Sequence, residues 1–213
     1  MNKFGCILFD LDGTLIDTTP LIFESFKHTF RHHFGRSMKE EEMLGYLGIP
    51  LKQPFLEMYP DQVDILIKTY REFNEENHDR YTGVFIGINR VLEECSKKGV
   101  RLGVVTSKRR GLAMRGLELF GLEKYMSVFV GLEDTAIHKP EAAPLLKAIE
   151  LCGIEDTGGV LYVGDSPYDI LCARNAGVKS AAVTGWSYLP PEKLLGVKPD
   201  ICLQNPGELL LYI

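Results

Sequence analysis

The sequence holds little that would mark a secreted, zinc-binding or membrane-spanning protein. Its 5 cysteines stand apart with no C-x-x-C pair, which is typical neither of a disulfide framework nor of a zinc site. No apolar run reaches the roughly 18 residues that a spanning helix needs. No basic segment followed by an apolar one precedes Phe4, so we see no secretory signal. These absences predict a cytoplasmic protein that does not insert into a membrane.

The chain also lacks an excess of positive charge. The net charge is −5, from 24 Lys and Arg against 29 Asp and Glu, so the sequence lacks the basic surface that a nucleic-acid partner requires. The short basic cluster Lys108-Arg109-Arg110 does not change this expectation, since it is interpreted as a solvated helix start or a local patch that attracts phosphate. With 213 residues, 45% of them hydrophobic, the chain is long enough for one large domain or for a core with a modest insertion.

Short apolar runs alternate with helical patterns along most of the chain, which predicts an α/β protein. Near-continuous apolar strands between helices indicate a parallel sheet that is covered on both faces. The expected strands are Gly5–Phe9, Arg101–Val105, Ser127–Val130, Val160–Val163, Lys179–Val183 and Asp200–Leu203. The expected helices are about Gly87–Lys98, Arg109–Phe120, Pro140–Cys152 and Pro167–Ala176.

One stretch, residues 18–81, breaks the alternation and shows no convincing strand. Its apolar side chains recur at helical intervals, as in Leu21, Phe26 and Phe30 or Leu66 and Tyr70. Such amphipathic helices need a partner for their apolar faces, so we expect a small helical bundle inserted after the first strand.

Two carboxylates follow the first predicted strand, in Asp10-Leu11-Asp12-Gly13-Thr14. Side chains two residues apart on an extended backbone point to the same side, and Gly13 allows the chain to turn sharply. A turn with no catalytic role remains the alternative for this segment by itself.

Two further polar segments follow later strands. Thr106-Ser107 is expected to open a helix, whose free amides and a hydroxyl would cradle a phosphate; an ordinary N-cap is the alternative. Lys139 precedes Pro140 beyond the strand that ends at Val130. A solvated lysine is the alternative there.

The last polar segment is Gly164-Asp165-Ser-Pro-Tyr-Asp169, in which two carboxylates four residues apart can reach one site across a helix start. A capped helix with a favourable first-turn acid is the alternative. Side chains beyond the carboxyl ends of parallel strands gather at one edge of the sheet. Carboxylates that share a site call for a divalent cation, and Mg²⁺ prefers oxygen ligands. A carboxylate nucleophile, a cation and a lysine together match phosphoryl transfer.

These four segments together resemble the haloacid dehalogenase superfamily, whose phosphatases carry D-x-D-G-T, a Thr or Ser, a Lys and G-D-x-x-x-D in this order. The resemblance covers essentially the whole chain. It implies a Rossmann-like catalytic core formed by residues 1–17 and 82–213, and a helical cap formed by residues 18–81 that governs substrate choice. It also implies a Mg²⁺-dependent hydrolase of small phosphorylated metabolites.

The resemblance assigns roles to the carboxylates. Asp10 would attack phosphorus, and Asp12 would protonate the leaving oxygen and later accept a proton from water. Mg²⁺ would be bound by the Asp10 carboxylate, the Asp12 main-chain carbonyl and Asp165, with Asp169 in support, directly or through water.

The remaining implied roles concern the phosphoryl group and the substrate. Thr106 and the Ser107 amide would hold phosphoryl oxygens, and Lys139 would offset their charge and that of Asp10. Candidates for substrate contact in the cap and the facing loops are Gly48, together with Tyr46, Ile49, Pro50, Lys52 and Arg109.

Within the superfamily the chain is similar to the phosphoglycolate phosphatase group and the closely related pyrophosphatases, because it has a short cap, Gly48-Ile49-Pro50 and Thr106-Ser107-Lys108. The resemblance implies a phosphoglycolate phosphatase first, with an inorganic pyrophosphatase of the same family as the alternative. A β-phosphoglucomutase-like phosphomutase and a non-catalytic phosphate-binding module remain alternatives. The last motif disfavours the mutase, and the presence of all the catalytic residue types disfavours the module. Both a monomer and a homodimer fit the sequence.

Overall fold

The computed structural model describes residues 4–213. The chain divides into two compact units. One, called the α/β unit here, joins the chain up to Asp17 with Val84–Ile213, and the other, the helical unit, is Thr18–Gly83. The described residues contain no helix with both the length and the apolar character needed to cross a membrane.

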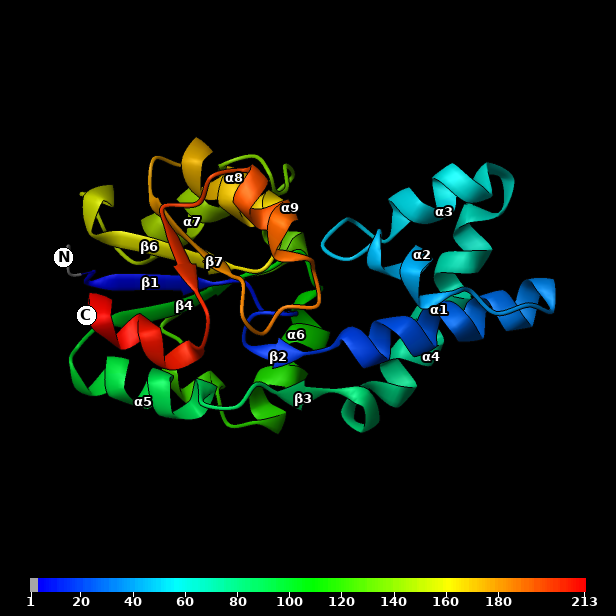
Figure 1. The fold of residues 1–213 in the computed structure, drawn as a ribbon, viewed down its shortest axis with the longest axis horizontal. Coiled ribbons are helices and arrows are strands. Elements are labelled where there is room, and N and C mark those ends of the chain that lie inside the picture. Colours follow the sequence, from blue (N-terminus) through cyan, green and yellow to red (C-terminus); the bar gives the residue numbers. More distant parts are fainter. Residues whose placement is uncertain (1–3) are drawn as a thin grey trace. The chain divides into compact units, whose positions relative to one another are not determined.

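The α/β unit is built on a six-stranded sheet in the order β5-β4-β1-β6-β7-β8 (Figure 1). Every neighbouring pair in it is parallel, so the predicted α/β fold is confirmed. The strands are β1 Cys6–Phe9, β4 Arg101–Val105, β5 Val128–Val130, β6 Val160–Gly164, β7 Lys179–Val183 and β8 Ile201–Leu203.

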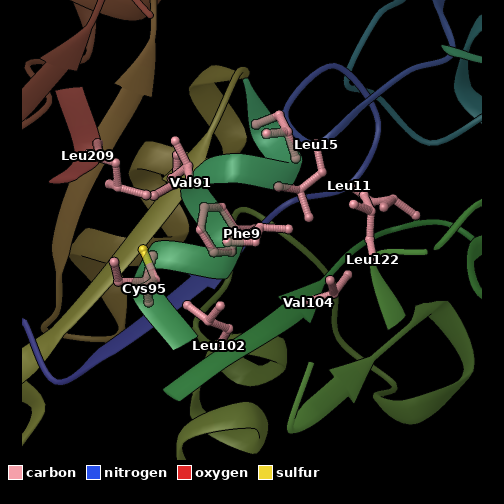
Figure 2. Packing of buried hydrophobic residues seen from close by; sticks show 14 of the residues in the cluster. Phe9, Leu11, Leu15, Val91, Cys95, Leu102, Val104, Leu122 and Leu209 are labelled. Atoms are coloured by element: carbon pink, nitrogen blue, oxygen red, sulfur yellow. The ribbon is translucent and has the colours of Figure 1, made fainter. Parts of the chain in front are cut away.

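Side chains alternate between the two faces of the central strands, as the period of two in a strand requires. On β1, Ile7 and Phe9 enter one hydrophobic cluster while Cys6 and Leu8 enter another. Figure 2 shows the first of these, with Phe9 among Val91, Cys95 and Leu102. Both faces of the sheet are therefore buried, which explains the near-continuous apolar strands.

Helices supply the other half of each cluster. The first cluster takes its helical residues from α5 (Ile88–Lys97) and α6 (Arg110–Leu119), and the second takes them from α7 (Ala143–Leu151) and α8 (Pro167–Asn175). The predicted covering of both faces is thus confirmed. The unit also contains α9 (Pro191–Gly196) and 3-10 turns at Glu123–Tyr125, Leu132–Asp134, Thr157–Gly159 and Pro206–Tyr212.

The helical unit consists of α1 (Thr19–Phe34), α2 (Glu40–Leu44), α3 (Lys52–Met58), a 3-10 turn at Pro60–Gln62 and α4 (Val63–Tyr81). Its core is aromatic, because Phe26 of α1 lies 5.0 Å from Tyr70 of α4 and 5.6 Å from Phe55 of α3, measured between ring centroids. A buried hydrogen bond joins α1 and α4, because the Asn74 side-chain amide of α4 donates to the Ser25 hydroxyl of α1 at 3.1 Å. These contacts give the helical unit a core of its own.

Several boundaries differ from the sequence-based prediction. Helix α6 begins at Arg110, so Thr106-Ser107 does not open it, and α7 begins at Ala143 instead of Pro140. Pro140 follows a cis peptide bond and lies in a turn before α7, whose first turn contains Pro144. A two-stranded sheet of β2 (Ile16–Asp17) and β3 (Gly83–Val84) was not predicted, since two residues per strand carry no periodicity.

A substitution at Gly103 of β4 would test the packing of the sheet. A Cβ at this position would lie 2.2 Å from Val128 Cγ1 and 2.9 Å from Leu8 Cδ2. We expect Gly103→Ala to destabilise the α/β unit by about 1–3 kcal/mol, the usual cost of overpacking. Urea unfolding followed through the fluorescence of the single tryptophan, Trp186, measures this change in the α/β unit.

Gly111→Ala in α6 is the matched control, because a Cβ there meets no atom within 4 Å. Helix propensity makes that change neutral or stabilising by up to about 1 kcal/mol. Equal effects of the two substitutions would contradict the packing described for β4 and β5.

Candidate active site

The loop after β1 brings Asp10 to the edge of the sheet. The Asp10 amide donates to the Val163 carbonyl of β6 at 2.9 Å, which continues the sheet pattern by one residue. The chain then turns at Gly13, whose φ is 78°, and a Cβ on Gly13 would lie 2.2 Å from Asp165 Oδ2. Only glycine at this position allows the loops after β1 and β6 to approach so closely.

Lys139 joins two of the predicted carboxylates. Its ammonium lies 2.9 Å from Asp10 Oδ1 and 2.6 Å from Asp169 Oδ1, and its side chain is only 6% exposed. It also donates to the Tyr162 hydroxyl at 3.1 Å. The solvated-lysine reading of this position is therefore wrong, since the ammonium is enclosed by oxygen atoms.

Asp169 has a structural task besides its pair with Lys139. Its Oδ2 accepts from both the amide and the hydroxyl of Ser166, at 3.0 and 2.7 Å, which forms a capping box at the start of α8. A Cβ on Gly164 would lie 2.4 Å from the Asp169 side chain. The fully buried Asp169 carboxylate is thus held both by Ser166 at the start of α8 and by Lys139 in the turn before α7.

Asp165 is oriented by two hydroxyl groups. Ser187 donates to its Oδ2 at 3.0 Å, and Thr14 donates to its Oδ1 at 3.4 Å. The Trp186 indole donates to the Thr14 carbonyl at 3.1 Å, so the loop after β7 braces the loop after β1 as well. Trp186 therefore borders the site through its polar atom while its ring packs against the core.

Asp12 pairs with a different cation. Its Oδ1 lies 2.8 Å from the ammonium of Lys108, which follows the Thr106-Ser107 segment. Thr106 is buried and its amide donates to the Val130 carbonyl at 2.9 Å, whereas Ser107 is exposed. Because Val104 is paired in register with Phe9, Thr106 lies at the same edge of the sheet as Asp10.

Burial dominates the electrostatics of the cluster. It raises the pKa of Asp10 to about 7, with Lys139 opposing the rise and Asp169 and Asp12 adding to it. Burial also raises the pKa of Asp165 well above its usual range, again with Asp10 and Asp169 contributing. For Lys139 burial alone would lower the pKa, but the Asp10 and Asp169 carboxylates outweigh it and hold the pKa well above the ordinary lysine value.

Three carboxylates in this cluster could hold a metal ion. Each of Asp10, Asp165 and Asp169 offers an oxygen atom, and these atoms lie within 4.8 Å of one another. When all three are ionised, the single ammonium of Lys139 leaves an excess of two negative charges. A hard divalent cation with oxygen ligands fits this donor set and this charge. Asp169 is fully buried and is held by the ammonium of Lys139 and by Ser166. Asp165 is only partly buried, and Asp10 has one oxygen without a hydrogen bond in the described part of the chain, so Asp10 and Asp165 fit best as direct ligands.

Gly48 lies in the helical unit, in the exposed turn between α2 and α3, where its φ is 79°. This conformation explains the glycine. Its predicted contact with substrate, like that of the other residues proposed in this turn, stays a prediction.

Sequence reasoning missed the partners of the predicted residues. In the sequence, Tyr162 resembles any other buried strand residue and Ser187 any other loop residue. Nothing near either residue therefore marks it as part of the site. Lys108 stood in a basic cluster interpreted as solvated or as attracting phosphate. Only its contact across 96 residues of sequence shows its relation to Asp12.

Comparison with known proteins agrees with the α/β fold. The profile of a family described as "Haloacid dehalogenase-like hydrolase" matches residues 7–183. A protein of Caldanaerobacter subterraneus named "Putative pyrophosphatase PpaX" is 49% identical over 211 residues, which are 99% of this chain and 95% of the relative.

Solved structures give the same picture. A haloacid dehalogenase-like family hydrolase of Streptococcus pneumoniae is 26% identical with a TM-score of 0.88 and covers 97% of each chain. A predicted phosphoglycolate phosphatase of Haemophilus somnus is 23% identical with a TM-score of 0.88, covering 99% of this chain and 98% of its own, and at that identity it shows the fold alone.

The acidic cluster predicts a stabilising response to Mg²⁺. A ligand that binds only the folded protein adds about 2.7 kcal/mol to the free energy of unfolding at 100 times its Kd. We expect thermal unfolding of the wild-type protein to shift upwards with Mg²⁺, and Asp165→Asn to lose most of this shift because a proposed metal ligand is gone. Asp61→Asn, a change of the same kind at an exposed residue of the helical unit, should respond as the wild type does. A full shift in Asp165→Asn would place the ion elsewhere.

Proposed function

The chain belongs to the haloacid dehalogenase-like hydrolase family, and on this premise we propose that it is a Mg²⁺-dependent phosphatase in which Asp10 receives the phosphoryl group before water releases it. The main support for this proposal is the position of Asp10. Lys139 binds its Oδ1 at 2.9 Å, and no residue in the described range 4–213 hydrogen-bonds its Oδ2. One carboxylate oxygen is thus fixed while the other is available to attack.

The reaction takes place in two displacements. In the first, Asp10 Oδ2 forms a bond to phosphorus while the bond to the leaving oxygen breaks, and Asp12 gives its proton to that oxygen. In the second, water attacks phosphorus, Asp12 takes the water proton, and the bond between phosphorus and Asp10 breaks. Both carboxyl groups return to their starting forms.

The residues around Asp10 have supporting roles in this proposal. Thr106 and the Ser107 amide bind phosphoryl oxygens at the end of β4, and Lys139 offsets the charge that gathers on them. Asp10 and Asp165 would hold Mg²⁺, which would supply positive charge to stabilise the transferring group. Asp169 keeps Lys139 in place through their contact at 2.6 Å.

Among substrates, we propose pyrophosphate first. Support comes from the relative that shares 49% of its residues with this chain and is named for pyrophosphate hydrolysis. The sequence by itself predicts phosphoglycolate first and pyrophosphate second, and the name of this relative reverses that order. Phosphoglycolate stays a prediction, as do the cytoplasmic location and the oligomeric state. The binding-module alternative lacks support, since the residues that turnover needs are all present.

Phosphate release from a panel of phosphorylated compounds tests the function. The panel contains pyrophosphate, phosphoglycolate, sugar phosphates and nucleoside monophosphates, each with and without Mg²⁺. We expect Mg²⁺-dependent turnover with pyrophosphate as the best compound, and a loss of about three orders of magnitude or more in Asp10→Asn, which keeps the shape of the side chain but removes the nucleophile.

Asp61→Asn serves as the control for the substitution itself and should keep wild-type turnover. Turnover that survives in Asp10→Asn would contradict the role of Asp10. A strong preference for phosphoglycolate would keep the mechanism and restore the original order of substrates.

A further inference from the structure

We propose that Lys108 is a positioning residue for Asp12, which holds one oxygen of this carboxylate so that the other meets the leaving group. The inference rests on the proposed function, since it presumes that Asp12 transfers the proton. It adds a residue to which the motifs assign no role in the proton transfer.

The ion pair between Lys108 and Asp12 is short, and its lysine is nearly buried. The Lys108 ammonium lies 2.8 Å from Asp12 Oδ1, the Lys108 side chain is 9% exposed, and that of Asp12 is 29% exposed. Within residues 4–213 no hydrogen bond reaches Asp12 Oδ2. A charge-assisted hydrogen bond of this kind fixes one oxygen and leaves the other free to bind the proton that Asp12 transfers.

The backbone of Lys108 is held from two sides, which fixes the direction of its side chain. Its amide donates to the Thr106 hydroxyl at 3.2 Å, and its carbonyl accepts from the Leu132 amide at 3.0 Å. A Cβ on Gly131 would lie 3.2 Å from the same carbonyl, so glycine lets the loop after β5 approach. The segment expected to hold the phosphoryl group therefore also holds the proton donor.

The neighbouring basic residues behave differently, which makes a general attraction to phosphate a poor explanation for Lys108. Arg109 is exposed, and Arg110 is an exposed residue that pairs with Asp134 at 2.6 Å on the outside of the unit. Lys108 alone of the three turns inward to a site carboxylate. The two lysines thus bind different carboxylates: Lys139 binds the proposed nucleophile Asp10, and Lys108 binds the proposed proton donor Asp12.

A role in positioning the proton donor has a specific kinetic consequence. A leaving group that is stable as an anion departs without a proton, whereas a basic leaving group requires one. Misplacing Asp12 should therefore slow the hydrolysis of phenyl phosphate much more than that of p-nitrophenyl phosphate. The two compounds differ little in shape but strongly in the basicity of the oxygen that leaves.

The experiment compares kcat/KM for these two compounds in the wild type, Lys108→Met and Lys108→Arg. We expect Lys108→Met to lower the value for phenyl phosphate by about tenfold or more beyond its effect on p-nitrophenyl phosphate, and Lys108→Arg to restore most of the loss. Lys147→Met removes an exposed lysine that pairs with Glu150 and should leave both values unchanged. Equal losses on both compounds, or no loss, would overturn the inference.

Failure of the proposed function gives a different result, because Asp10→Asn would then hydrolyse both compounds as the wild type does. A second measurement judges Lys108 even in that case. Crystal structures of the wild type and Lys108→Met should show the Asp12 carboxylate in one orientation in the first and in another, or in several, in the second. An unmoved Asp12 in Lys108→Met would overturn the inference.

Discussion

The site depends on one buried ammonium group. Lys139 is almost fully enclosed and contacts both Asp10, in the loop after β1, and Asp169, in the first turn of α8. A buried carboxylate without a partner is costly, and removing one member of such a set leaves the others uncompensated. The loops after β1 and β6, and the turn before α7, must therefore meet at one point. The sheet order β5-β4-β1-β6 makes this possible, because it places the ends of the three strands that carry Asp10, Thr106 and Asp165 side by side.

A second constraint is the space between these loops. Gly13 and Gly164 leave room for the Asp165 and Asp169 side chains, and a Cβ at either glycine would overlap them. The carboxylates approach closely enough that burial and mutual repulsion raise the pKa values of Asp10 and Asp165. The same crowding creates the need for a cation. The glycines and the proposed Mg²⁺ are thus two consequences of one arrangement, in which negative groups are collected to handle a negative substrate.

The sequence predicted the parts of this arrangement that repeat or that stand at strand ends. Alternation of strands and helices gave the α/β fold, and the position of Asp10, Thr106 and Asp165 after β1, β4 and β6 follows from it. Local patterns misplaced the starts of α6 and α7, since Thr106 resembles an N-cap and Pro140 resembles a first helical residue. Tyr162, Ser187 and Lys108 were beyond sequence reasoning because their roles exist only as contacts across the fold. Roles in catalysis stay proposals for every residue of the site.

In the proposed mechanism Asp10 becomes phosphorylated during turnover. Acid quenching of the enzyme with pyrophosphate and Mg²⁺, followed by borohydride reduction, converts an acyl phosphate on an aspartate into an alcohol that peptide mass spectrometry can locate. We expect the reduced residue to be Asp10 and its amount to depend on Mg²⁺ and substrate. Turnover without a reduced residue, or reduction at another carboxylate, would contradict it.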